Sequence, residues 1–216
     1  MTDDIYGWQR LTSAADPDFA AFHRIYRASL PARERKSRAQ LAAMVEQPSY
    51  LVLLLKDAAG VAGFGVVYVS EGERFALLEY LAVAGDRRGA GLGSRLFRAC
   101  MAEVRARYGA WPMLIEVDSE REDSADRALR LRRKRFYRAL GCRDVQGLDY
   151  LLPLPGKGPA PRMDLMLCAE PLPAAVDKAE LGRWLQDIYV TVYGRKPDDR
   201  RLERMLAPLD SAVSLA

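Results

Sequence analysis

Apolar and polar stretches alternate in the first half of the chain in a way that predicts antiparallel strands. Apolar runs cover residues 51–56, 61–70 and 75–84, and polar turn residues separate them at 57–60 and 71–73. A shorter run at 8–11 predicts one more strand near the start. The pattern therefore predicts a strand followed later by a three-stranded meander.

Two segments between the first strand and the meander have the apolar spacing of helices. For the first segment, Asp16 and Pro17 predict an N-cap and a first helical residue. For the second segment, Ser37 and Gln40 have the spacing of a capping box, and the helix is expected to end before Pro48.

A strand at 113–118 and a long helix at 123–140 are predicted after the meander. Because a helix joins the 75–84 strand to the 113–118 strand, these two strands are expected to lie parallel. The expected apolar stripe of the long helix consists of Ala125, Leu129, Phe136 and Leu140. Its many arginines are interpreted as a solvated face, since aromatic residues that would stack on bases are not interleaved with them.

The last part of the chain predicts two more strands and a helical extension. The strands are expected at 149–153 and 163–169, joined by a loop that contains Pro155, Gly156, Gly158, Pro159 and Pro161. Asp177 and Glu180 predict the start of a helix that Gly194 and Pro197 end, and a short helix follows. We therefore predict a domain of residues 1–170 and an extension of residues 171–216, which packs on the domain or mediates a homodimer.

Composition narrows the class of protein without identifying it. The 216 residues are 50% hydrophobic, enough for a good core, and the net charge of +4 permits an anionic ligand without requiring nucleic acid. The first ten residues lack the apolar core of a signal peptide, and no apolar run approaches the ~20 residues that span a bilayer. A cytoplasmic protein without membrane contact is expected. Three cysteines (Cys100, Cys142 and Cys168) lack metal-ligand spacing, so we expect reduced packing residues and no metal.

The segment at 85–96 joins a predicted strand to a predicted helix and carries Gly89, Gly91 and Gly93 at alternate positions. Glycines let the backbone approach a ligand, and the N–H groups of the first helical turn bind anions. Arg87 and Arg88 add charge-assisted hydrogen bonds that suit a nucleotide pyrophosphate. An ATPase-type phosphate loop is excluded because no lysine follows Gly93. The glycine offsets also fit a dinucleotide fingerprint poorly, so a nicotinamide oxidoreductase is a weaker alternative.

Two motifs in order carry a resemblance to a known family. Arg88-Gly89-Ala90-Gly91-Leu92-Gly93 resembles the R/Q-x-x-G-x-G/A pyrophosphate loop of the GNAT superfamily of N-acetyltransferases. Residues 135–142 resemble the helix-ending FYxxxGF segment of that family, with Cys142 in place of the usual aromatic residue. The resemblance covers roughly residues 6–169. It implies an α/β (α+β) GNAT fold, in which helices cover both faces of a mixed, mostly antiparallel sheet with a splayed parallel strand pair.

The resemblance also implies acetyl-CoA as cosubstrate. Main-chain groups at the end of the 75–84 strand would pair with pantetheine, and N–H groups of the glycine loop would hold the pyrophosphate beside the two arginine side chains. The residues expected to bind acetyl-CoA are Leu81, Ala82, Val83, Arg87, Arg88, Gly89, Ala90, Gly91, Leu92, Gly93 and Ser94. The asparagine that the family usually carries on the long helix is absent, and arginines hold its place.

Acyl transfer to an amine also needs a base and an acid. Glu79 and Glu116 each interrupt an apolar strand, so each is either a base or the partner of an arginine on the 123–140 helix. The family places its acid at varied offsets, and Glu79 is the first candidate. Tyr137 is the candidate acid for the leaving thiolate, the alternative being packing beside Phe136. His23, the one histidine, is expected to be half-buried and noncatalytic.

These features predict an acetyl-CoA-dependent N-acetyltransferase in which a primary amine attacks the thioester directly. The acceptor stays open among small amines, antibiotics, amino acids and proteins. The basic connector with Arg33, Arg35 and Arg38 is either a solvated loop or a site for an anionic acceptor. The alternative from another class is a noncatalytic CoA-binding module that regulates or assembles through the C-terminal helices. A nucleic-acid binder using the arginine helix is a weaker rival.

Overall fold

The computed structural model describes residues 6–121, 125–153 and 161–216. Asp123, the predicted start of the long helix, and Pro155, Gly156, Gly158 and Pro159 of the predicted loop lie outside the described residues. The chain forms two compact units. The first unit contains residues up to 69 together with 76–109, and the second contains 70–75 and 110–216.

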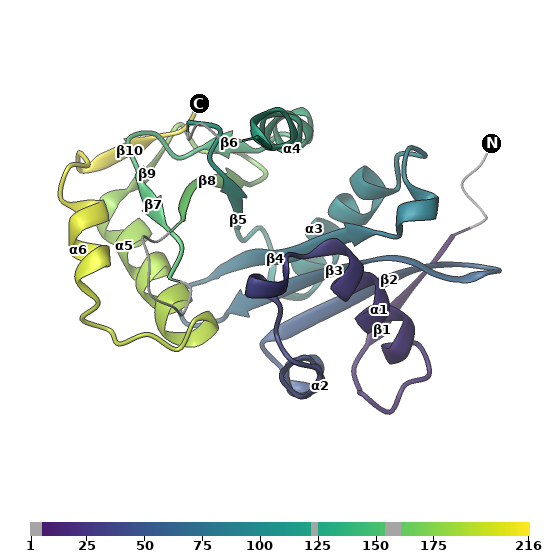
Figure 1. The fold of residues 1–216 in the computed structure, drawn as a ribbon. Coiled ribbons are helices and arrows are strands. Elements are labelled where there is room, and N and C mark those ends of the chain that lie inside the picture. Colours follow the sequence, from purple (N-terminus) through teal and green to yellow (C-terminus); the bar gives the residue numbers. More distant parts are fainter. Residues whose placement is uncertain (1–5, 122–124, 154–160) are drawn as a thin grey trace. The chain divides into compact units, whose positions relative to one another are not determined.

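The first unit is built on the predicted antiparallel meander. Its strands follow the order β1 (Gly7–Leu11), β2 (Tyr50–Asp57), β3 (Gly60–Ser70) and β4 (Phe75–Val83). Its helices are α1 (Phe19–Ser29), the 3-10 turn η2 (Ala32–Glu34), α2 (Arg38–Glu46), the 3-10 turn η3 (Gly85–Arg87) and α3 (Leu92–Tyr108). Helices α1 and α2 lie on one side of the strands and α3 on the other (Figure 1). The four strands predicted for this part of the chain are confirmed by β1 to β4.

Different contacts hold the two layers of helices to these strands. On the α1 side, the ring of Phe22 meets the ring of Phe64 edge-on, with centroids 4.8 Å apart. On the α3 side, a Cβ on Gly65 would lie 2.4 Å from Sγ of Cys100. Because α3 packs this closely on β3, position 65 needs glycine, and Cys100 is the buried free thiol that was predicted.

The helix starts of the first unit were predicted with mixed success. Ser37 and Gln40 form the predicted capping box, with both reciprocal hydrogen bonds present. The prediction for α1 is wrong by two residues, because the helix begins at Phe19 with Asp18 as its N-cap. Asp16 instead accepts a hydrogen bond from the Asp18 N–H over 2.8 Å, which forms a turn ahead of the helix.

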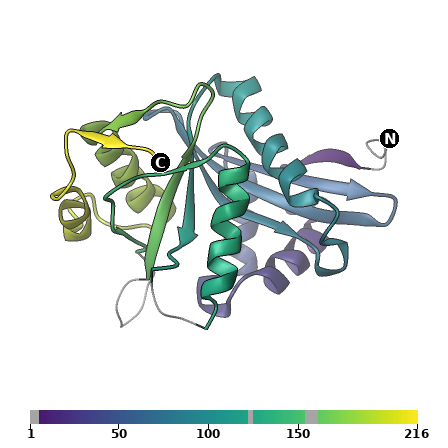
Figure 2. The same ribbon diagram turned by 90° about the horizontal axis from the view of Figure 1, so that it is seen from above.

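The second unit is built around β8 (Arg162–Cys168), which pairs antiparallel with three other strands. These are β5 (Met113–Asp118), β6 (Arg143–Asp144) and β7 (Tyr150–Leu151). The remaining elements are α4 (Arg127–Ala139), α5 (Lys178–Asp187), the π-helix η4 (Ile188–Val192), α6 (Arg200–Leu206) and an antiparallel pair, β9 (Ala175–Asp177) with β10 (Ala212–Ser214). Figure 2 shows α4 running alongside β5 and β8. The strand predicted at 149–153 is shorter than expected, and β6, β9, β10 and η4 were not predicted.

The C-terminal extension packs within the second unit. Asp177 caps α5 as predicted, and the apolar face of the helix is buried. Trp184 of α5 donates from Nε1 to the carbonyl of Glu73 over 3.1 Å, and its ring lies 5.8 Å from that of Phe75. A backbone bridge joins Val145 to Leu215. The division at residue 170 and homodimerisation both stay predictions.

Charge, more than apolar area, fixes α4. The predicted apolar stripe is wrong, because Leu129 is 54% exposed and the buried residues of α4 are Lys134 and Tyr137. Nζ of Lys134 lies 2.6 Å from Asp164 and 2.9 Å from Asp144. Burial by itself lowers the pKa of Lys134, but hydrogen bonds to these carboxylates raise it above its ordinary value.

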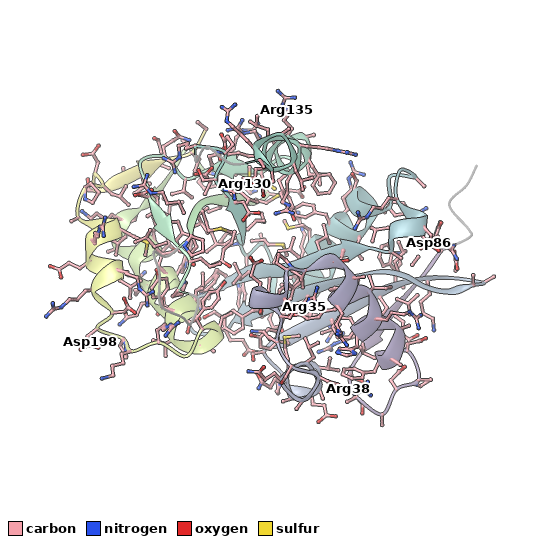
Figure 3. The ribbon with its side chains drawn as sticks, viewed as in Figure 1. Arg35, Arg38, Asp86, Arg130, Arg135 and Asp198 are labelled. Carbon is pink, nitrogen blue, oxygen red and sulfur yellow. The ribbon has the colours of Figure 1, made fainter. Side chains whose placement is uncertain are left out.

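The arginines of α4 are likewise not a uniform solvated face. Arg133 pairs with Asp118, Arg138 pairs with Asp144, and Arg130 lies 3.1 Å from Asp126. Arg135 projects outward from the helix (Figure 3). Within the described residues, no helix is long and apolar enough to cross a membrane.

Candidate active site

The glycine loop follows β4 and leads into α3. Gly89 and Gly91 have φ angles of +94° and +73°, a region that L side chains rarely adopt. A Cβ at either position would meet nothing within 4 Å. The backbone conformation therefore requires glycine here, while the space above the loop stays open to an approaching ligand.

The start of α3 supplies hydrogen-bond donors to this open space. Gly91 is the N-cap of the helix, and its carbonyl accepts from Ser94 at 3.1 Å and Arg95 at 3.2 Å. The amides of Leu92 and Gly93 lie in the first turn, where an α-helix has no carbonyl of its own to offer them. The positive end of the helix dipole lies at the same place. The loop can therefore bind an anion such as a phosphate.

The two loop arginines have different surroundings. Arg87 pairs with Asp57 at the end of β2, and this carboxylate raises the pKa of Arg87 above its ordinary value. Asp86, 3.4 Å from Arg87 Nε, lies exposed on η3 (Figure 3). Arg88 is exposed, and its Nε lies 3.4 Å from the carbonyl of Val83. Arg88 is therefore better placed than Arg87 to reach a bound phosphate.

The end of β4 changes character at Glu79. Residues 75–78 are buried, whereas residues 79–83 are half-buried. Leu81 and Val83 pack against a small cluster made of Leu55, Ala62, Leu92 and Leu96. A Cβ on Gly63 would lie 2.8 Å from the carbonyl of Ala82. The strand segment predicted to bind pantetheine is thus fixed by packing while part of it stays accessible.

Glu79 is surrounded by a lysine and by tyrosines. Its side chain is 4% exposed, and Nζ of Lys36 lies 2.9 Å from Oε1, an ion pair by distance rather than a directed hydrogen bond. Burial and then the charge of Glu79 raise the pKa of both Tyr50 and Tyr80. The described ion-pair partner of Glu79 is thus a lysine of the same unit, and pairing with an arginine of α4 stays a prediction.

The connector between α1 and α2 delivers Lys36 to this place. The Lys36 N–H donates to the hydroxyl of Tyr26 over 2.8 Å, and the Tyr26 ring meets the Tyr80 ring edge-on at 5.1 Å. We call Tyr26, Lys36, Tyr50, Glu79 and Tyr80 the Glu79 cluster. Sequence reasoning missed its lysine and tyrosines, although Lys36 stands out as the one lysine in a connector of arginines.

Two of the connector arginines that were considered for an anionic acceptor, Arg35 and Arg38, have partners inside the first unit. Nε of Arg35 donates to the carbonyl of Leu30 over 2.7 Å, and the guanidinium of Arg38 lies 5.1 Å from the centre of the Phe19 ring. Both side chains are labelled in Figure 3. Binding of an anionic acceptor by this connector stays a prediction.

Glu116, the second candidate base, lies on β5 in the second unit. One carboxylate oxygen accepts from the hydroxyl of Tyr150, and the other accepts from the hydroxyl of Tyr193 over 2.5 Å. Burial and the charge of Glu116 raise the pKa of Tyr150 well above its ordinary value. The described partners of Glu116 are therefore hydroxyls that tie β5 to β7 and to the end of η4.

The remaining candidates, Tyr137 and His23, each lie beside an aromatic ring. Tyr137 is 8% exposed on α4, and its ring lies 5.0 Å from Phe136. Its role as an acid stays a prediction. The imidazole of His23 stacks on Phe19 at 6.4 Å, and burial, with Arg38 and Arg27, lowers its pKa, so His23 has the surroundings of a packing residue. Cys142 and Cys168 are buried free thiols.

Comparisons with known proteins were made for the family, for curated proteins and for solved structures. The model of the acetyltransferase (GNAT) family matches residues 8–141. A search of curated proteins finds no match. A Bacteroides thetaiotaomicron protein assigned to the GNAT acetyltransferases is 19% identical, with a TM-score of 0.72 over 88% of this chain and 99% of its own.

Two further solved structures contain coenzyme. An aminoglycoside 6′-N-acetyltransferase complexed with coenzyme A is 19% identical, with a TM-score of 0.58 over 77% of this chain and 98% of its own. Arabidopsis thaliana NAA60 in complex with acetyl-CoA is 15% identical, with a TM-score of 0.58 over 76% of this chain and 98% of its own. At these identities the likeness is one of fold, and it confirms the predicted fold class.

Proposed function

Because the chain belongs to the acetyltransferase (GNAT) family, we propose that it transfers the acetyl group of acetyl-CoA to a primary amine. The observation that carries the proposal is the glycine loop at the start of α3. Its two glycines with positive φ, its free first-turn amides and the open space above them suit a diphosphate. The family match indicates that this diphosphate is that of acetyl-CoA. Two of the similar solved structures contain acetyl-CoA or CoA.

The half-buried end of β4 would receive the rest of the coenzyme. Leu81, Ala82 and Val83 present main-chain groups next to the loop, and their side chains or backbone are held by β3 and α3. A strand end fixed in this way can pair with the amides of pantetheine without moving, which lowers the entropic cost of binding. Polarisation of the thioester carbonyl by a main-chain N–H in this segment would stabilise the charge that develops on its oxygen.

Glu79 is the group that would accept a proton from the attacking amine. It lies two residues before Leu81 on the same strand, a separation of about 7 Å along β4. Its carboxylate is nearly buried and already holds an ammonium group, that of Lys36, at 2.9 Å. A carboxylate that binds one alkylammonium group can bind another. When the carboxylate takes a proton from that group, it leaves the neutral amine needed for attack.

The direct test is release of CoA from acetyl-CoA by the purified chain in the presence of a panel of amines. We expect amine-dependent release together with an acetylated amine of the corresponding mass. A noncatalytic CoA-binding module would bind acetyl-CoA and release no CoA with any amine. The melting temperature separates the acetyltransferase and the CoA-binding module from a nicotinamide enzyme. For either of the first two, CoA should raise the melting temperature and NAD should not.

The loop can be tested separately through Gly91→Val. The side chain would enter the open space, so we expect acetyl-CoA binding in calorimetry to weaken by at least about tenfold. Gly109→Val is the matched control, because Gly109 ends the same helix with a φ of +90° and equally open surroundings. Equal losses of affinity in both variants would mean that strain, not the loop site, is being measured.

A further inference from the structure

Lys36 holds a primary amine against the carboxylate proposed as the base. Its Nζ lies 2.9 Å from Oε1 of Glu79, and the lysine side chain is 22% exposed. The backbone of Lys36 is fixed by its hydrogen bond to Tyr26, and the next residue, Ser37, caps α2. The backbone from which this side chain extends is therefore fixed, and the ion pair with Glu79 positions the amine rather than leaving it free in solvent.

From this contact we infer that Lys36 is a site of self-acetylation, at which the chain transfers the acetyl group of acetyl-CoA to its own lysine. The inference rests on the proposed acetyl transfer. The lysine side chain ends in a primary amine on an unbranched stem, which is the chemical class of the proposed acceptor. It already occupies the place at Glu79 that an external amine would have to take.

The reaction needs no reagent beyond acetyl-CoA. Glu79 takes a proton from the Lys36 ammonium, and the nitrogen lone pair then forms a C–N bond to the carbonyl carbon of the thioester. The C–S bond breaks, and the sulfur leaves with its electron pair as a thiolate. The nitrogen, positively charged after its attack, loses its second proton to solvent as the amide forms, and solvent protonates the thiolate. The products are Nε-acetyl-lysine at position 36 and CoA. No group is oxidised or reduced.

The other described lysines have different surroundings. Lys56 pairs with Asp18 and donates to Oε1 of Gln9 over 2.8 Å, at the far end of β2 from Tyr50. Lys134 is buried among carboxylates, Lys178 donates to the carbonyl of Leu209 over 2.7 Å, and Lys196 is exposed. Among the lysines that the structure describes, Lys36 is thus the one held by Glu79.

Lys56 is a matched control for the experiment. Both lysines belong to the first unit and pair with a carboxylate, and their side chains are 22% and 31% exposed. The chain is incubated with acetyl-CoA and no amine, and the intact mass and the proteolytic peptides are followed with time. We expect one acetyl group per chain, located at Lys36 and added at least about tenfold faster than at Lys56, because a positioned amine reacts with a high effective concentration.

Variants locate the reaction further. Lys36→Arg should lose the rapid acetylation, because a guanidinium does not give up its proton near neutral pH. Lys56→Arg should keep it. The rate per chain should not change with protein concentration, since donor site and lysine belong to one unit of the same chain. A rate that rises in proportion to protein concentration would overturn self-acetylation within one chain.

The outcome is separable from that of the proposed function. Amine-dependent CoA release by a preparation whose Lys36 stays unmodified would overturn this inference and leave the acetyltransferase intact. Slow, even acetylation of Lys36, Lys56 and the exposed lysines would also overturn it, because that is the pattern of uncatalysed reaction with solvent-accessible amines. Neither CoA release nor acetylation would overturn both proposals.

Discussion

Two glutamates that look alike in the sequence have opposite surroundings in the two units. Glu79 and Glu116 each interrupt an apolar strand. In the first unit, Glu79 faces the ammonium of Lys36, delivered by a connector that is partly exposed. In the second unit, both oxygens of Glu116 accept hydrogen bonds from tyrosine hydroxyls, one of them from the fully buried Tyr150.

The nature of the partner of each carboxylate determines whether a substrate can replace that partner. An alkylammonium on a half-exposed side chain can be displaced by another one, so we expect Glu79 to be available to a substrate amine. The hydroxyls around Glu116 belong to side chains that also hold the extension together, as Tyr150 packs edge-on to Tyr189. Displacing them would open the core of the second unit, so we interpret Glu116 as a structural residue.

The largest effect that separates the two glutamates is on the rate. Glu79→Gln removes the proton acceptor without changing side-chain size, and we expect the rate of CoA release to fall by about 10²- to 10⁴-fold. Glu116→Gln should change the rate of the folded enzyme by less than about threefold, because it leaves the proposed base in place. The opposite pattern in CoA release would give the role of base to Glu116.

The unfolding free energy tests the structural role that we assign to Glu116. Glu116→Gln weakens the acceptance of two hydroxyls, and we expect the unfolding free energy in urea to fall by about 2 kcal/mol. The control is Glu103→Gln, which removes a surface pair with Arg107 and should cost no more than about 0.5 kcal/mol. Equal losses in the two variants would mean that the hydroxyl contacts of Glu116 contribute nothing.

A single hydroxyl should account for part of this effect. Tyr193→Phe keeps the ring and removes one donor to Glu116, so we expect a loss of about 1 kcal/mol in unfolding free energy, with CoA release unchanged. The same urea titration measures it. An increase in the unfolding free energy would show that this oxygen of Glu116 is more favourably hydrogen-bonded to water than to the hydroxyl of Tyr193.

The smallest predicted effect is a loss of stability at high pH, to which one buried tyrosine in each unit contributes. The pKa of Tyr50 in the first unit and of Tyr150 in the second is raised above 10.0, so the unfolded chain loses these protons before the folded chain does. Their contribution to stability is fully present below pH 10 and is lost as the pH rises above it. At pH 10 each tyrosine should lower the unfolding free energy by about 0.4 kcal/mol relative to pH 7. Unfolding free energies of Tyr50→Phe and Tyr150→Phe at both pH values check this, and a steeper fall in either variant would contradict it.

Local signals in the sequence predicted much of the fold. Ser37 and Gln40 lie three residues apart, so their capping box depends on almost nothing else in the chain. The apolar runs of the meander and the glycine loop are equally local, and both were placed within a residue or two. The start of α1 was missed because Asp16 and Asp18 are both plausible caps, and the turn before the helix decided between them.

The failures involve residues far apart in the sequence. On α4, Lys134 was not part of the predicted apolar stripe, yet it is buried against carboxylates of β6 and β8. The ion pairs of Lys134 with Glu120, Asp144 and Asp164 outweigh the burial of Leu129, which the apolar spacing had favoured. The partner of Glu79 was missed for the same reason, since no pattern along the chain connects Lys36 to β4.

One measurement tests most directly whether Glu79 takes the proton of the amine. The rates of CoA release by the wild type and by Glu79→Gln are compared from pH 7 to pH 9.5 with one alkylamine acceptor. An alkylamine, with a pKa near 10.4, loses its own proton increasingly as the pH rises, so the need for a base falls. We expect the ratio of the two rates to be largest at pH 7 and to shrink steadily towards pH 9.5. A ratio that stays constant over this range would contradict a role for Glu79 as the base.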